Sequence, residues 1–196
     1  MQERKINDVL KIGREILAKS KIDTREARLL LAEALDVSAM DLIKLTSCSD
    51  EEVAKYLVML EKRVNDIPFA YIVGHKEFMK LDFIVNESVL IPRADTEILV
   101  EEALKYRKNK ILDMCTGSGC IAISLAYYLE NKADVTALDI SEEALNVAEQ
   151  NAKNNNVDVK FIQSDLFSNV TEKYEMIVSN PPYIESEVIK NLQPEV

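Results

Sequence analysis

The chain of 196 residues has no tryptophan, one histidine, three cysteines and only four glycines. No apolar run approaches the roughly 18 residues that a membrane helix needs, and the first residues lack the apolar core of a secretory signal. The cysteines, Cys48, Cys115 and Cys120, have neither the even count of a disulfide framework nor the spacing of a metal site. We therefore expect no membrane span, no bound metal and a reducing, cytoplasmic location.

Charge is distributed unequally along the chain. Residues 1–73 hold 12 basic and 13 acidic side chains, net −1, whereas residues 74–196 hold 12 and 21, net −9, which agrees with the formal charge of −10. An acidic half repels a phosphate backbone, so duplex DNA is a poor substrate candidate. No basic, aromatic-rich stretch of the kind that binds nucleic acid is present either.

Helical periodicity dominates the N-terminal third. Helices are predicted around residues 6–17, 27–35, 38–45 and 50–67. Asp23, followed by Glu26 three residues later, predicts a capping box at the start of the second of these helices. Because amphipathic helices bury their apolar stripes against one another, residues 1–73 are predicted to form a small helical-bundle domain.

The pattern then changes to short β-type runs. Lys76–Met79 and Asp82–Val85 predict a β-hairpin linker over residues 74–95, and a helix is expected to begin near Thr96. Further on, strands are predicted at 111–114, 135–139, 159–163 and 176–179, and helices at 119–130 and 142–154, the second capped by Ser141. This alternation predicts an α/β domain over residues 96–196, with a parallel sheet covered on both faces.

A glycine-rich loop follows the first strand of that domain. Gly117-Ser118-Gly119-Cys120-Ile121-Ala122 matches G-x-G-x-x-A between a strand and a helix, and Asp139 comes 20 residues after Gly119. Such glycines let the backbone approach a ligand, and the acid at the end of the next strand can accept hydrogen bonds from both ribose hydroxyls. The match also fits a nicotinamide or flavin site, and a plain glycine turn beside a solvated aspartate.

Two further carboxylates favour S-adenosyl-L-methionine over a dinucleotide as the ligand of this loop. Asp113 stands at the exit of its strand, where it can bind an α-ammonium group and would repel a pyrophosphate. Asp165 closes the third strand and could accept from an adenine amino group, with Leu166 packed on the ring; a helix or turn cap is the alternative role for Asp165. Three acids at three successive strand ends point to a cofactor site.

The apolar run 176–178 leads into Asn180-Pro181-Pro182-Tyr183. The side-chain oxygen of Asn180 and the backbone carbonyl of Pro181 could accept both N–H groups of a planar nitrogen, and Tyr183 could stack on it. Prolines fix φ and remove competing donors, which keeps the carbonyls oriented. The alternative is an Asn-Pro turn that joins a strand to a helix. Downstream of the glycine loop, the motif indicates an N-methyltransferase.

At these residues the chain resembles the release-factor glutamine methyltransferases, the HemK/PrmC family, which methylate the side-chain amide of the Gly-Gly-Gln loop in peptide-chain release factors. The matching stretches are Pro68–Gly74, Glu77-Phe78, Leu90–Glu97, Asp113–Ala122, Ser164–Phe167 and Val178–Ile184. The Asn-Pro-Pro-Tyr element also occurs in DNA adenine and ribosomal guanine methyltransferases, so it does not identify the family by itself. The Ile-Pro-Arg…Thr-Glu segment and the helical N-terminal domain restrict the resemblance to the release-factor enzymes.

The resemblance implies a Rossmann-like methyltransferase sheet and release factors as protein partners, gripped in part by the N-terminal helices. It implies cofactor contacts at Cys115, Thr116, Gly117, Ser118, Gly119, Asp139 and Leu166. It also implies substrate contacts at Asn180, Pro181, Pro182 and Tyr183, of which Asn180, Pro181 and Tyr183 are the catalytic candidates. Two residues depart from the family: Cys115 replaces a frequent glycine, and Leu166 stands where some relatives have a larger ring.

Family members continue past the tyrosine and complete a seven-stranded sheet. This chain ends at Val196 with about four predicted parallel strands, so we expect an incomplete sheet, a truncated or clipped form, and a fourth strand left at an exposed edge. The nearest rival function is methylation of an exocyclic amino group on a nucleic-acid base. A second rival is a non-catalytic fragment that only binds its partner, and a dehydrogenase is the weakest, since it has no use for Asn180–Tyr183.

Overall fold

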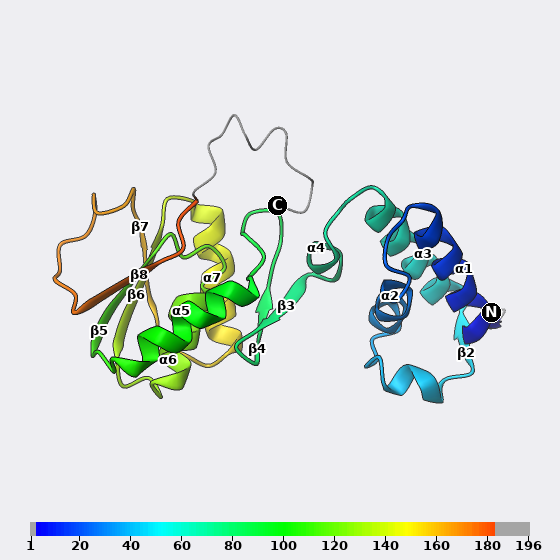
Figure 1. Cartoon of the computed structure of the whole chain (residues 1–196), viewed down its shortest axis with the longest axis horizontal. Coiled ribbons are helices and arrows are strands. Elements are labelled where there is room, and N and C mark those ends of the chain that lie inside the picture. Colours follow the sequence, from blue (N-terminus) through cyan, green and yellow to red (C-terminus); the bar gives the residue numbers. More distant parts are fainter. Residues whose placement is uncertain (1–2, 183–196) are drawn as a thin grey trace. The chain divides into compact units, whose positions relative to one another are not determined.

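The computed structural model describes residues 3–182 (Figure 1). Its contacts divide the chain into two compact units, of which the first ends at Val73 and the second begins at Gly74. In the described range, no helix is both long and apolar enough to cross a membrane.

The N-terminal unit is a helical bundle with one short β-ladder. Its helices are α1 (Ile6–Lys19), α2 (Glu26–Ala34), α3 (Asp50–Val64), α4 (Phe69–Val73) and the 3₁₀ helix η1 (Asp41–Lys44). Strands β1 (Glu3–Lys5) and β2 (Ser47–Ser49) pair antiparallel. The short helix predicted at 38–45 is thus a single 3₁₀ turn, and the β-ladder was not predicted.

Tyr56 lies at the centre of this unit's core. The core contains Leu17, Leu30, Leu31, Leu42 and Leu60 from four different helices, all at most 2% exposed. The Tyr56 hydroxyl donates to the carbonyl of Ala27 at 3.0 Å, so its one polar atom is satisfied inside the core. Gly13 of α1 faces the same hydroxyl, and its lack of a side chain lets α1 approach α3.

The predicted capping box at Asp23 and Glu26 is wrong. Asp23 instead accepts from the backbone N–H of Arg25, and the Glu26 carboxylate pairs with the buried Arg63 of α3 at 2.6 Å. The capping box of this unit is at Ser49 and Glu52, at the start of α3. Glu26 pairs with an arginine 37 residues away, and the spacing of residues in the sequence does not reveal such a partner.

The second unit begins with a hairpin and continues as alternating strands and helices. Its elements are β3 (His75–Phe78), β4 (Leu81–Ile84), α5 (Ala94–Lys105), β5 (Lys110–Met114), α6 (Cys120–Tyr128), β6 (Asp134–Asp139), α7 (Glu142–Asn154), β7 (Lys160–Gln163) and β8 (Met176–Ser179). The predicted strands, helices and hairpin are all present; α7 and β8 have the predicted bounds, and the others are shifted by one or two residues at one or both ends. Ser141 caps α7 as predicted, because its Oγ accepts from the backbone N–H of Ala144 at 3.1 Å.

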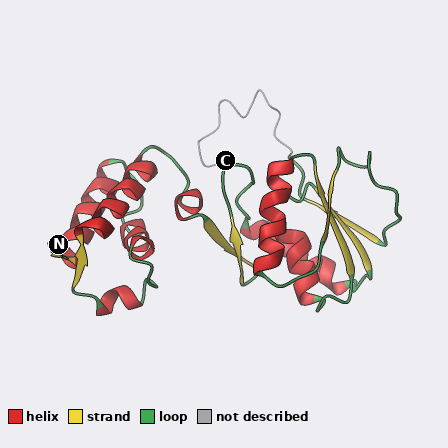
Figure 2. Ribbon diagram, turned by 180° about the vertical axis from the view of Figure 1, so that it is seen from behind, coloured by secondary structure: helices red, strands yellow, loops and turns green. Residues whose placement is uncertain are grey.

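The main sheet of the described region is parallel, in the order β7-β6-β5-β8. Strand β8 lies at one edge, as expected from the sequence, and Ile177 on it is 51% exposed. Figure 2 shows α5, α6 and α7 together on one side of the strands and a loop on the other. That loop buries Leu112, Met114 and Leu138 beneath Val170 and Tyr174. The parallel sheet is thus covered on both faces, as predicted, and within residues 3–182 the cover is helical on one face and a loop on the other.

Candidate active site

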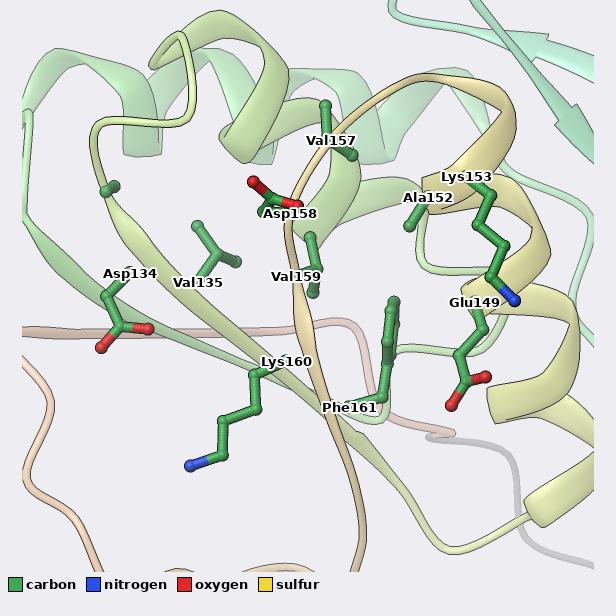
Figure 3. Close-up of a pocket in the computed structure, with 11 residues that line it drawn as sticks. Asp134, Val135, Glu149, Ala152, Lys153, Val157, Asp158, Val159, Lys160 and Phe161 are labelled. Atoms are coloured by element: carbon green, nitrogen blue, oxygen red, sulfur yellow. The ribbon is translucent and has the colours of Figure 1, made fainter.

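The carboxyl ends of the four strands meet at one edge of the sheet, as they must when all strands are parallel. A cavity of about 580 Å³ lies elsewhere, at the opposite edge (Figure 3). Its walls include Asp134 and Lys160, where β6 and β7 begin, and Glu149 and Lys153 of α7. It holds none of the predicted site residues, so the loops at the carboxyl edge form the candidate site.

The glycine loop leaves β5 in a left-handed turn. Cys115, Gly117 and Gly119 have φ values of +61°, +54° and +80°. A Cβ on Gly119 would lie 3.0 Å from that of Ala148 and 2.8 Å from Ile123 Cδ1, so this glycine allows α6 and α7 to pack closely. A Cβ on Gly117 would have no described atom within 4 Å, which leaves the backbone open to a ligand. The two glycines thus serve different purposes.

Asp113 is fully buried under this loop. Its Oδ2 accepts from the Thr116 hydroxyl at 2.6 Å and from the backbone N–H of Ala122 at 3.2 Å, which ties the loop and the start of α6 to β5. Its Oδ1 has no hydrogen-bond partner among residues 3–182. Burial raises the pKa of Asp113 to about 7, although both hydrogen bonds oppose the rise. The same carboxyl group holds the loop and offers one unused oxygen.

Asp139 connects the end of β6 to the same loop. Its Oδ2 accepts from the backbone N–H of Gly117 at 2.9 Å, and its Oδ1 accepts from that of Ser141 at 3.1 Å. Ser118 is buried, and its carbonyl accepts at 2.9 Å from Asn151, a fully buried residue of α7. Asn151 also bonds both backbone groups of Ile84 in the hairpin, so it joins the hairpin to the loop. Nothing in the sequence pattern identified Asn151.

The end of β7 presents apolar surface. Leu166 is 51% exposed with φ +45°, and the Ser164 hydroxyl donates to its carbonyl at 2.8 Å. Ile140, just beyond the neighbouring β6, is 65% exposed and was missed in the sequence, although its place directly after Asp139 could have suggested it. Asp165 is exposed, with its backbone carbonyl in a turn to Ser168.

Pairing between β5 and β8 brings Asn180 to the glycine loop. Ser179 lies opposite Met114 in the ladder, and its hydroxyl donates to the Met114 carbonyl at 2.7 Å. The residues that follow these two are Asn180 and Cys115, which are therefore neighbours at the strand ends. The Asn180 Nδ2 donates to the Thr96 hydroxyl at 3.2 Å. Pro181 and Pro182 are exposed, and Tyr183 lies outside the described residues.

The sequence is similar to known proteins over most of its length. It matches the family description "Methyltransferase small domain" over residues 93–193 and "PrmC N-terminal domain" over residues 8–74. The release factor glutamine methyltransferase of Clostridium botulinum is 37% identical over 204 residues, which cover 97% of this chain and 72% of that protein. The chain belongs to the release factor glutamine methyltransferase family. The protein of the same name from Buchnera aphidicola is 39% identical, with 98% of this chain and 72% of that protein covered.

Membership of this family confirms the predicted fold class, the methyltransferase class and S-adenosyl-L-methionine as the cofactor. Among solved structures, the tRNA (uracil-54, C5)-methyltransferase of Pyrococcus abyssi in complex with S-adenosyl-L-homocysteine has a TM-score of 0.48 and 23% identity, with 62% of this chain and 31% of that chain covered.

Proposed function

We propose that this chain transfers a methyl group from S-adenosyl-L-methionine to the glutamine side-chain amide in the Gly-Gly-Gln loop of peptide-chain release factors. One observation carries the proposal: the β5–β8 ladder sets Asn180 beside the glycine loop that begins at Cys115. A slot for an amide and a loop for a cofactor then share one edge of the sheet. Sequence similarity to the release factor glutamine methyltransferases supports the choice of substrate.

The residues at that edge fit the cofactor chemically. The unused, buried Oδ1 of Asp113 suits an α-ammonium group, and the open backbone at Gly117 leaves room for the methionine part. Asp139 lies at the end of β6, where an acid accepts from ribose hydroxyls, and the exposed Ile140 and Leu166 offer apolar cover for an adenine ring. We assign the remaining contacts to the loop residues Cys115, Thr116, Ser118 and Gly119 and to Asp165.

In this proposal Asn180 and Pro181 position the amide nitrogen of the substrate. The lone pair of an amide nitrogen is delocalised into its carbonyl, so the nitrogen is a weak nucleophile. Bound S-adenosyl-L-methionine supplies a strongly activated methyl group. The Oδ1 of Asn180 and the carbonyl of Pro181 accept the two N–H groups of the glutamine, which holds the nitrogen with its reactive face toward the cofactor. The proton leaves after transfer, so a dedicated general base is not needed. Pro182 and Tyr183 complete the slot in this proposal.

The partner is a protein and not a nucleic acid in this proposal. The N-terminal unit, residues 1–73, carries a net charge near zero, and the second unit is acidic, which disfavours a phosphate backbone. We assign the N-terminal unit to gripping the release factor, and residues 74–95 to linking it to the methyltransferase domain, residues 96–196. Release factors act on ribosomes, so the proposed location is the cytoplasm.

Methyl transfer from tritiated S-adenosyl-L-methionine tests the proposal. The chain is incubated with a release factor, with the same factor whose loop glutamine is replaced by glutamate, and with tRNA, rRNA or DNA. We expect label only in the unmodified release factor, and at least about a tenfold loss with Asn180→Ala, since one oriented acceptor is removed. Label confined to nucleic acid would overturn the proposal in favour of base methylation. Release-factor binding without any label would indicate a non-catalytic fragment.

A further inference from the structure

One contact in the site joins two segments that are 84 residues apart. Asn180 Nδ2 lies 3.2 Å from the hydroxyl oxygen of Thr96, which is the third residue of α5. Thr96 is only 8% exposed, although it is polar and near the start of a helix. The family comparison and the cofactor assignment give this threonine no role.

In this structure the contact holds the nitrogen end of the Asn180 amide toward Thr96. The oxygen and nitrogen ends of a side-chain amide have nearly the same shape, so packing alone does not distinguish them. In the proposed reaction only the oxygen end can accept from the substrate N–H₂. An amide turned by 180° would present its own N–H₂ to the substrate, and the two groups of donors would repel each other. A partner that holds the nitrogen end away from the substrate therefore favours the reactive orientation.

Thr96 is well placed to hold that end. Its side chain is β-branched, which restricts χ1, and its backbone N–H donates to the Arg93 carbonyl at 3.0 Å. The helix itself is anchored on both sides: Val100 and Ala103 are buried in the core, and the Glu97 carboxylate accepts from the backbone N–H of Met79 at 2.7 Å. The acceptor for Asn180 thus belongs to a rigid element.

We propose that Thr96 is a positioning residue, which orients the Asn180 amide so that its oxygen faces the substrate nitrogen. The inference rests on the proposed function for the identity of the substrate. It does not rest on that function for the contact itself. In this proposal Thr96 acts through Asn180.

Kinetics of matched variants test this role. Thr96→Val keeps the shape of the side chain and removes the hydroxyl, whereas Thr96→Ser keeps the hydroxyl. Loss of one hydrogen bond of ordinary strength should lower kcat about five- to tenfold in Thr96→Val, leave the KM for S-adenosyl-L-methionine unchanged, and be largely restored in Thr96→Ser. Thr136→Val is the control, because Thr136 of β6 is also a buried threonine and has no part in the proposed site; it should alter the Tm and not kcat.

The same substitution in the Asn180→Ala variant distinguishes a positioning role of Thr96 from a general structural effect. If Thr96 acts through Asn180, adding Thr96→Val to Asn180→Ala should cause no further loss of the residual rate. A full second loss in the double variant, or a Thr96→Val rate equal to that of Thr136→Val, would contradict the inference.

A spectroscopic measurement distinguishes failure of this inference from failure of the proposed function. The side-chain amide signal of Asn180 is assigned in ¹⁵N–¹H spectra of the uniformly labelled chain by its loss in Asn180→Asp. We expect Thr96→Val to shift this signal and speed its hydrogen exchange, whether or not the chain methylates a release factor. Absence of methyl transfer by the unaltered chain would refute the function alone, and an unmoved Asn180 signal would refute the role of Thr96.

Discussion

At the residue scale, Asp113 is a strongly perturbed group of the site. Burial raises its pKa from the usual 3.8 to about 7. A carboxyl group whose pKa is raised in the folded state binds its proton more tightly there than in the unfolded chain. Its contribution to the free energy of unfolding is therefore fully present below about pH 3.8 and is lost as the pH rises through about 7.

We expect this loss to disappear in Asp113→Asn. The amide oxygen can still accept from Thr116 and Ala122, while the side chain no longer ionises. Thermal unfolding at several pH values between about 4 and 8 should show the Tm of the unaltered chain falling relative to that of the variant as the pH rises. A constant difference in Tm across this range would contradict the expectation, because it would mean that Asp113 does not titrate there.

Gly13 is the second residue with a decisive local environment. An added Cβ would lie 1.7 Å from the Tyr56 hydroxyl oxygen and 2.7 Å from its Cζ. Gly13→Ala should therefore push Tyr56 from its hydrogen bond to Ala27 and lower the free energy of unfolding by about 2–3 kcal/mol.

Urea unfolding measures the effect of Gly13→Ala. Lys11→Ala, at an exposed position of the same helix, is the control and should change stability by less than about 0.5 kcal/mol. Helix propensity by itself favours alanine over glycine by about 1 kcal/mol, so a stabilised Gly13→Ala variant would mean that propensity outweighs the clash.

At the element scale, the β3–β4 hairpin turns through two residues with positive φ, Met79 at +50° and Lys80 at +60°. Such a turn usually contains Asn or Gly. Here the backbone N–H of Met79 donates to Glu97, and its carbonyl accepts from the Tyr128 hydroxyl at 2.6 Å. The turn contains no glycine, and these contacts with α5 and α6 stabilise its left-handed backbone instead.

Lys80→Gly should therefore stabilise the protein by about 0.5–1 kcal/mol, because it relieves left-handed strain at an exposed position. The matched control is Lys76→Gly, an exposed residue of β3 with negative φ, where a glycine should destabilise by a similar amount. Tm values of both variants measure the effect, and a lower Tm for Lys80→Gly would show that the turn is not strained.

At the scale of the whole molecule, each unit has a core of its own. The N-terminal unit buries Leu17, Leu30, Leu31, Tyr56 and Leu60 among its own helices. A fragment of residues 1–74 should consequently fold alone, with modest stability, since a unit of this size buries a limited core. Circular dichroism should show a helical spectrum and a cooperative thermal transition. The same fragment with Leu30→Asp should lack both, and a fragment without a cooperative transition would mean that this unit needs the second one.

Much of the fold follows from the sequence by itself. The apolar runs and their periods located the hairpin, the parallel strands and the helices of the second unit, because such a pattern is a local property of the sequence. The same local signals identified the glycine loop, Asp139 and the Asn-Pro-Pro-Tyr element as parts of a site.

Only the tertiary structure decided which of these parts meet. The pairing of β8 with β5 sets Asn180 beside Cys115, and Thr96 reaches Asn180 across 84 residues. Sequence spacing predicted a partner at Asp23 for Glu26, whereas packing of α2 on α3 supplies Arg63. Burial of Asp113, which raises its pKa, likewise depends on α6 closing over β5. Strand partners, helix contacts and burial arise between segments that are distant in the chain, so the local sequence pattern does not predict them.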